Sequence, residues 1–144
     1  MYLGYQNNKI KFYTEEPLDK ELYNLDEIIE TQDEYVLDGD EYVLNDETYK
    51  EKQAQKEKER IAKLFLTAAD VERGIYKAKK ITFEVLVSQL QNNEEIDIEE
   101  LKIELKANHF YRGNPYVSMI GNILGFTEEQ LDKFFEDGNY EHLL

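Results

Sequence analysis

The chain has 144 residues and a mass of 17.1 kDa, which suits one globular domain or a small domain with an appendage. It carries 32 acidic and 17 basic side chains, for a formal net charge of -15. The absence of cysteine excludes disulfides, thiol catalysis and cysteine-ligated metal sites. No stretch approaches the roughly 18 consecutive apolar residues of a membrane span, and the first residues show no signal-peptide pattern.

The negative charge is concentrated in the first third of the chain. Residues 1–49 hold 14 Asp or Glu and 3 Lys, whereas residues 50–144 hold 18 acidic and 14 basic side chains. Nucleic-acid affinity comes largely from Lys and Arg that release counterions, so we expect no direct nucleic-acid binding. The acidic surface either keeps the protein in solution or docks on a basic surface of another protein.

Residues 2–13 predict two short strands around an Asn7-Asn8 turn, because asparagine tolerates positive φ and the flanks are aromatic or β-branched. The segment from Leu18 to Glu30 has leucines at helical spacing among many acidic residues. We interpret it as a weak helix or an ordered loop.

A five-residue repeat follows, since residues 33–37 (Asp-Glu-Tyr-Val-Leu) recur as residues 40–44. Asp38-Gly39 lies between the copies and predicts a hairpin with a type I′ turn, which needs positive φ at both central residues. A calcium loop is disfavoured because the acids lack the EF-hand spacing.

The hairpin is a candidate contact surface for a protein partner. Tyr35 and Tyr42 would supply amphipathic area. An acidic rim that speeds association with a basic partner would come from Asp33, Asp38, Asp40 and Glu41. In the alternative interpretation, the two tyrosines only pack the hairpin onto the helical half.

From about Asp46 a long charged helix is expected, capped by Asn45 or Asp46 and ending in an apolar stripe that includes Phe65. Further helices are predicted from N-caps at Thr67, Thr82, Asp97, Asn114 and Thr127. The predicted fold class is therefore α+β, with three regions. These are an acidic β-rich region of residues 1–45, a connecting helix of residues 46–66 and a small helical bundle of residues 67–144.

Motifs for catalysis are missing from the sequence. It contains no glycine-rich phosphate loop and no HExxH helix, and His109 is interpreted as a loop or capping side chain. Residues 120–131 resemble a helix-turn-helix, but an acidic second helix would repel DNA, which favours a simple helical corner. We expect no enzymatic activity, no cofactor and no bound metal.

The segment from Phe110 to Tyr116 is aromatic and carries a basic residue in an acidic protein. It is either a loop whose aromatic rings fill the core or a partner-binding surface. In the second case Tyr111 and Arg112 would make the contacts, since Tyr and Arg are favoured at interface hot spots.

Three stretches, residues 59–67, 107–115 and 120–135, together resemble small prophage proteins encoded near tail-fibre genes in anaerobic, AT-rich bacteria. The resemblance implies a non-enzymatic accessory protein of tail or tail-fibre assembly that acts by protein–protein binding in the host bacterial cytoplasm or on the virion. Acidic phage proteins also include anti-CRISPR inhibitors of host nucleases, and this alternative stays open. Either partner would present a basic surface, and no membrane is involved.

Overall fold

A computed structural model describes all 144 residues and confirms the α+β fold class. The chain forms two compact units, Met1–Gln55 and Lys56–Leu144, whose boundary falls inside helix α1 (Glu47–Ala62). The division into three regions stays a prediction. None of the helices combines the length and the apolar character that a membrane crossing requires.

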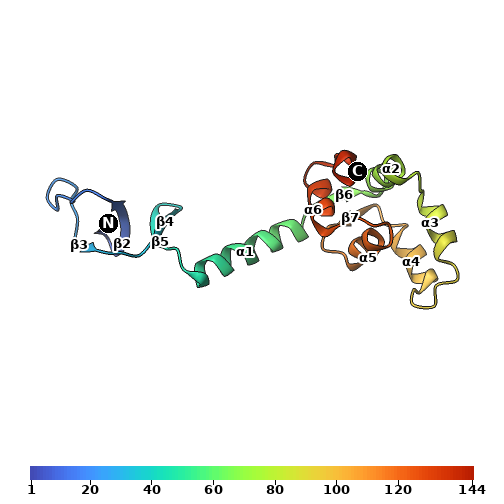
Figure 1. Cartoon of the computed structure of the whole chain (residues 1–144), viewed down its shortest axis with the longest axis horizontal. Coiled ribbons are helices and arrows are strands. Elements are labelled where there is room, and N and C mark those ends of the chain that lie inside the picture. Colours follow the sequence, from blue (N-terminus) through green and yellow to red (C-terminus); the bar gives the residue numbers. More distant parts are fainter. The chain divides into compact units, whose positions relative to one another are not determined.

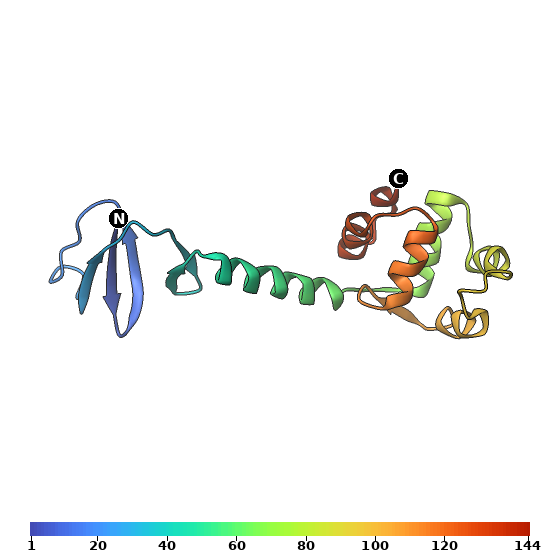
Figure 2. The same cartoon turned by 60° about the horizontal axis from the view of Figure 1, so that its bottom comes forward.

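The N-terminal unit begins with a three-stranded antiparallel sheet. Strand β1 (Tyr2–Gln6) lies between β2 (Lys9–Thr14) and β3 (Glu27–Glu30), as Figure 2 shows. The predicted turn is confirmed, since Asn7 and Asn8 connect β1 to β2 with φ of 52° and 63°. The interpretation of residues 18–30 as a helix or loop is wrong for residues 27–30, because these form β3 and pair with β1.

The predicted second hairpin consists of β4 (Tyr35–Asp38) and β5 (Glu41–Leu44). Its turn is shifted by one residue from the prediction, because the two-residue loop is Gly39-Asp40. Only Gly39 has a positive φ, 68°, which is the pattern of a type II′ turn with glycine in first position. Because Asp38 pairs directly with Glu41, both residues lie at the turn end of the hairpin.

The N-terminal unit has little apolar interior. Leu3 and Leu25 are its two fully buried hydrophobic side chains. A Cβ on Gly4 would stand 3.0 Å from the methyl groups of Leu18 and Leu25, so glycine in β1 lets these leucines pack onto the sheet. Helix α1 follows, with Asp46 accepting the Tyr49 amide at 2.9 Å as its cap, and it has no buried residue.

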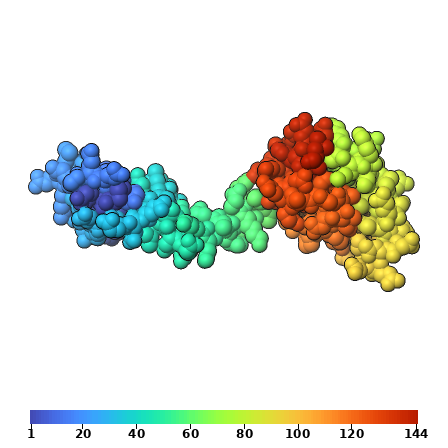
Figure 3. Space-filling view, in the orientation of Figure 1, coloured from blue at the N-terminus to red at the C-terminus, as the bar shows by residue number.

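In the C-terminal unit, the predicted caps start five helices (Figure 1). They are α2 (Ala68–Lys79), α3 (Phe83–Leu90), α4 (Ile98–Glu104), α5 (Pro115–Ile123) and α6 (Glu128–Asp137). A 3-10 helix, η1 (Tyr140–Leu143), packs against α2 and α6, and Figure 3 shows the C-terminal residues beside α2. The corner between α5 and α6 is made by Gly125 at φ 83°.

The unit also contains a two-stranded antiparallel sheet that the sequence did not predict. Strand β6 (Phe65–Thr67) pairs with β7 (His109–Tyr111), and Phe65 lies opposite Tyr111. Two predictions are corrected here. Helix α1 ends at Ala62, so Phe65 does not belong to a helical stripe, and His109 lies in a strand rather than in a loop or cap.

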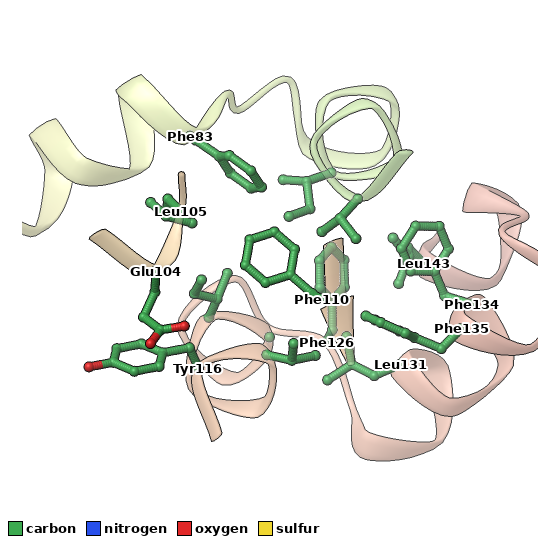
Figure 4. A pocket seen from close by; sticks show the side chains of 15 residues that line it. Phe83, Glu104, Leu105, Phe110, Tyr116, Phe126, Leu131, Phe134, Phe135 and Leu143 are labelled. Carbon is green, nitrogen blue, oxygen red and sulfur yellow. The ribbon is translucent and has the colours of Figure 1, made fainter. Parts of the chain in front are cut away.

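Thirteen buried hydrophobic residues form the core of the C-terminal unit. Phe110 of β7 points into it, as Figure 4 shows. Its ring meets that of Phe83 edge-on, with the two ring centroids 6.0 Å apart. Two helix glycines allow close packing, because a Cβ on Gly74 would stand 2.5 Å from the Phe134 ring and one on Gly121 2.5 Å from Leu131.

Candidate partner-binding surfaces

The hairpin tyrosines lie on one face and pack within the N-terminal unit. The ring of Tyr13 on β2 lies 5.6 Å from that of Tyr35 and 5.9 Å from that of Tyr42. Burial raises the pKa of the Tyr35 phenol. Both rings are half-buried, so Tyr35 and Tyr42 have a packing partner, Tyr13, within their own unit.

Among the acidic residues of the hairpin, Asp40 differs from its neighbours. Lys11 donates to the Asp40 carbonyl at 2.8 Å and to its carboxylate at 3.0 Å, and Lys9 lies 3.5 Å from the same carboxylate. The hydrogen bond from Lys11 lowers the pKa of Asp40. Asp40 therefore ties the hairpin to β2, whereas Asp38 and Glu41 form no ion pair.

The acidic character extends over the whole N-terminal unit. Residues 1–55 hold 15 acidic and 5 basic side chains, and only Asp40 and Glu47 of these carboxylates are ion-paired. Exposed carboxylates without such a partner include Glu15, Glu16, Glu21, Glu27, Glu30, Asp33 and Asp38. The unit presents a largely uncompensated negative surface.

The two other predicted contact residues, Tyr111 and Arg112, belong to the C-terminal unit. The structure thus brings together Tyr35, Asp38, Asp40, Glu41 and Tyr42 in one hairpin, and Tyr111 and Arg112 in a different unit. Tyr111 is 48% exposed, as a contact residue should be, whereas Arg112 is only 7% exposed.

Arg112 is engaged by side chains of its own unit. Its Nε donates to Asp132 at 2.8 Å, one terminal nitrogen to Ser118 at 3.0 Å and the other to the Glu128 carboxylate. The hydrogen bond from Arg112 lowers the pKa of Glu128. Two of the acids on the helix that resembled a DNA-reading helix therefore hold the end of β7 against α5 and α6.

The outer face of the small sheet carries a cluster that sequence reasoning missed in part. Phe65, His109 and Tyr111, here called the aromatic face, have ring centroids 5.5, 5.7 and 5.2 Å apart, an almost regular triangle. Phe65 is 59% exposed, and His109 is also exposed. The signal in the sequence is alternation, because Leu66 and Phe110 take the inner positions of the same strands.

Two further features of the structure bear on metal and ligand binding. No group of three or more His, Asp or Glu side chains is placed to hold a metal ion. The core encloses a cavity of about 30 Å³ lined almost wholly by apolar side chains, including Val71, Val117 and Phe134. The apolar lining offers a water few of the polar partners that it needs, so we expect this cavity to be dry.

Comparisons with known protein families, with curated proteins and with solved structures found no match.

Proposed function

We propose that this chain is a non-enzymatic protein that acts by binding a basic surface of another protein through its acidic N-terminal unit. The observation that carries the proposal is the charge of that unit, in which lysines neutralise only two carboxylates. Such a surface raises the encounter rate with a basic partner and disfavours acidic ones.

The hairpin β4–β5 is the part of this unit best suited to the contact. Asp38 and Glu41 stand at its tip without ion pairs, and Leu37 beside them is 60% exposed. Tyr35 and Tyr42 fix the hairpin on Tyr13, so a partner would meet a pre-formed element and would not have to order it. Asp40 acts in this scheme by holding the hairpin to β2.

Within this class, an accessory role in phage tail or tail-fibre assembly, in the host cytoplasm or on the virion, is the particular function we propose. It rests on the resemblance of residues 59–67, 107–115 and 120–135 to prophage proteins. The second candidate is an inhibitor of a host defence nuclease, and the net charge of -15 favours it, because an acidic protein can compete with nucleic acid for a basic channel.

The test compares the whole chain with a double variant, Asp38→Asn with Glu41→Gln. Each protein is used to capture partners from the source cells, and association with the captured partner is then timed at several salt concentrations. We expect the double variant to associate severalfold more slowly at low salt, with the difference closing as salt rises.

A matched control removes the same charge from the other unit. Glu94→Gln with Glu95→Gln neutralises two exposed carboxylates of residues 56–144 and should leave the association rate unchanged. Equal slowing by both double variants would mean that only the net charge of the protein matters. The hairpin would then not be the contact surface. A tail protein as the partner supports assembly, whereas a nuclease that loses its nucleic acid when the chain binds supports inhibition.

A further inference from the structure

The C-terminal unit covers several of its aromatic rings with its own lysines. The ammonium group of Lys77 lies 5.2 Å from the ring centroid of Tyr140, that of Lys79 5.5 Å from Phe126 and that of Lys80 5.1 Å from Tyr76. These are cation–π distances, at which the negative face of the ring attracts the charge. Lysines of helix α2 and its cap thus recur as partners of rings in this unit.

The aromatic face lacks such a partner. No lysine or arginine lies over Phe65, His109 or Tyr111, although Lys63 is only two residues from Phe65 in the chain. The adjacent Arg112 cannot serve, because its guanidinium is turned to Asp132, Ser118 and Glu128. Three neighbouring rings on the paired strands β6 and β7 are therefore left with exposed π surface.

We propose that the aromatic face binds an arginine-bearing segment of a partner protein. A guanidinium group is weakly hydrated and stacks on aromatic rings, which makes arginine a better occupant than lysine. The charge of the unit is complementary, since residues 56–144 hold 17 acidic and 12 basic side chains. This site lies in the other unit from the hairpin and does not depend on the function proposed for that hairpin.

The same charge argues against a nucleic-acid base as the occupant. Stacking platforms for single strands are combined with a positively charged groove that follows the phosphates. Here the nearest arginine is neutralised by two carboxylates, and the unit is net negative. The test nevertheless includes a single-stranded oligonucleotide, and its preferential binding to the aromatic face would be the competing outcome.

The test uses the full chain and a synthetic peptide in which arginines alternate with glycine and serine. The comparison peptide replaces each arginine by citrulline, which keeps the shape of the side chain and removes its charge. Titrations are run at about 0.1 M and about 1 M NaCl, where the Debye length is about 10 Å and 3 Å. The higher salt concentration screens diffuse attraction to the acidic N-terminal unit, so that binding at the aromatic face can be distinguished from it.

The decisive variants are Tyr111→Ala and Tyr76→Ala. Both tyrosines are 48% exposed, but the ring of Tyr76 is already covered by Lys80. We expect Tyr111→Ala and Phe65→Ala to weaken arginine-peptide binding about five- to tenfold and Tyr76→Ala to leave it unchanged. A chemical-shift map should place the peptide on β6 and β7, and unchanged melting temperatures would show that the variants fold.

A second pair of variants tests whether a cation supplied by the protein itself can occupy the aromatic face. His109→Lys puts a cation beside Phe65 and Tyr111, as Lys80 does at Tyr76, and should abolish peptide binding, whereas His109→Gln should reduce it only in part. Equal binding of the citrulline peptide, equal loss in Tyr76→Ala and Tyr111→Ala, or preferential binding of oligouridine to the aromatic face would each overturn the proposal.

Discussion

The two units differ in how they combine charge with apolar burial. The N-terminal unit has 15 acidic and 5 basic side chains around two buried hydrophobic residues, Leu3 and Leu25. The C-terminal unit has 17 acidic and 12 basic side chains around a core of thirteen. Like charges repel in a compact unit, and buried apolar area is the main term that opposes unfolding.

The difference indicates which forces hold each unit. The N-terminal unit depends on strand pairing, on the rings around Tyr13 and on the ion pairs of Asp40 with Lys9 and Lys11. The C-terminal unit depends on close packing at Phe134 and Gly74 and on the ion pairs of Arg112. Salt should weaken the Asp40 ion pairs of the first unit while it also screens the repulsion among its unpaired carboxylates. Small changes of volume should damage the second unit.

The largest effect is expected in the packed core. Phe134 is 1% exposed, and Phe134→Ala should lower the free energy of unfolding by about 3–5 kcal/mol, because it removes apolar contacts and leaves a cavity. Urea denaturation followed by near-ultraviolet circular dichroism measures it. Leu37→Ala, at a side chain 60% exposed in the hairpin, should stay within about 0.5 kcal/mol of the wild type. Equal losses would remove the contrast between the units.

A smaller loss is expected where the core excludes a single methyl group. Alanine normally stabilises a helix relative to glycine by about 1 kcal/mol, but in Gly74→Ala the new Cβ meets the Phe134 ring at 2.5 Å. We predict a net destabilisation of about 1–3 kcal/mol. In a Phe134→Leu background the same change should cost less, and thermodynamic additivity of the two substitutions would contradict the contact.

The contribution of the Arg112–Glu128 ion pair to the free energy of unfolding should depend modestly on pH. Because the pKa of Glu128 is lowered in the folded state, its contribution is present above the ordinary value of 4.5 and is lost as pH falls through the lowered pKa. The Glu128 side chain is 56% exposed, so we expect a difference below about 1 kcal/mol between the wild type and Glu128→Gln near neutral pH. Denaturation at a series of pH values should show this difference shrinking as pH falls below 4.5 and vanishing once pH is below the lowered pKa. Glu129→Gln is the control, since Glu129 contacts only Lys133 and is 79% exposed.

Local signals in the sequence predicted much of the fold. Side-chain caps such as Thr67, Thr82 and Thr127 act within a few residues, so they can be recognised without knowledge of the tertiary structure. The same holds for Asn7-Asn8, whose positive φ values are a property of the turn itself. The hairpin turn was placed one residue early because Asp-Gly and Gly-Asp are both good turn pairs, and the register of the strands decides between them.

The small sheet in the C-terminal unit could not be predicted in the same way. Its strands have three residues each and are about 40 residues apart in the chain, so neither is long enough to show a reliable period alone. As a result Tyr111 was recognised as a candidate contact, but its neighbours Phe65 and His109 were not. The role of Arg112 depends on Asp132 and Glu128, which only the fold brings to it.

The smallest effect, and the one that sharpens the contrast, concerns Asp40. Its carboxylate accepts a hydrogen bond from Lys11, which lowers its pKa, whereas Asp38, two residues earlier, has no ion pair. The contribution of Asp40 is therefore present above its ordinary pKa of 3.8 and is lost as pH falls through the lowered value. We predict that Asp40→Asn speeds hydrogen exchange of the β4 and β5 amides near neutral pH at low salt and that Asp38→Asn does not.

Because the ion pair of Asp40 with Lys11 is exposed, about 1 M NaCl should remove most of the difference by reducing the Debye length to about 3 Å. Amides of α5 and α6 should exchange at the same rate in both variants. Equal exchange of the hairpin amides in the two variants at low salt would mean that strand pairing and the Tyr13 contacts hold the hairpin without help from its charge.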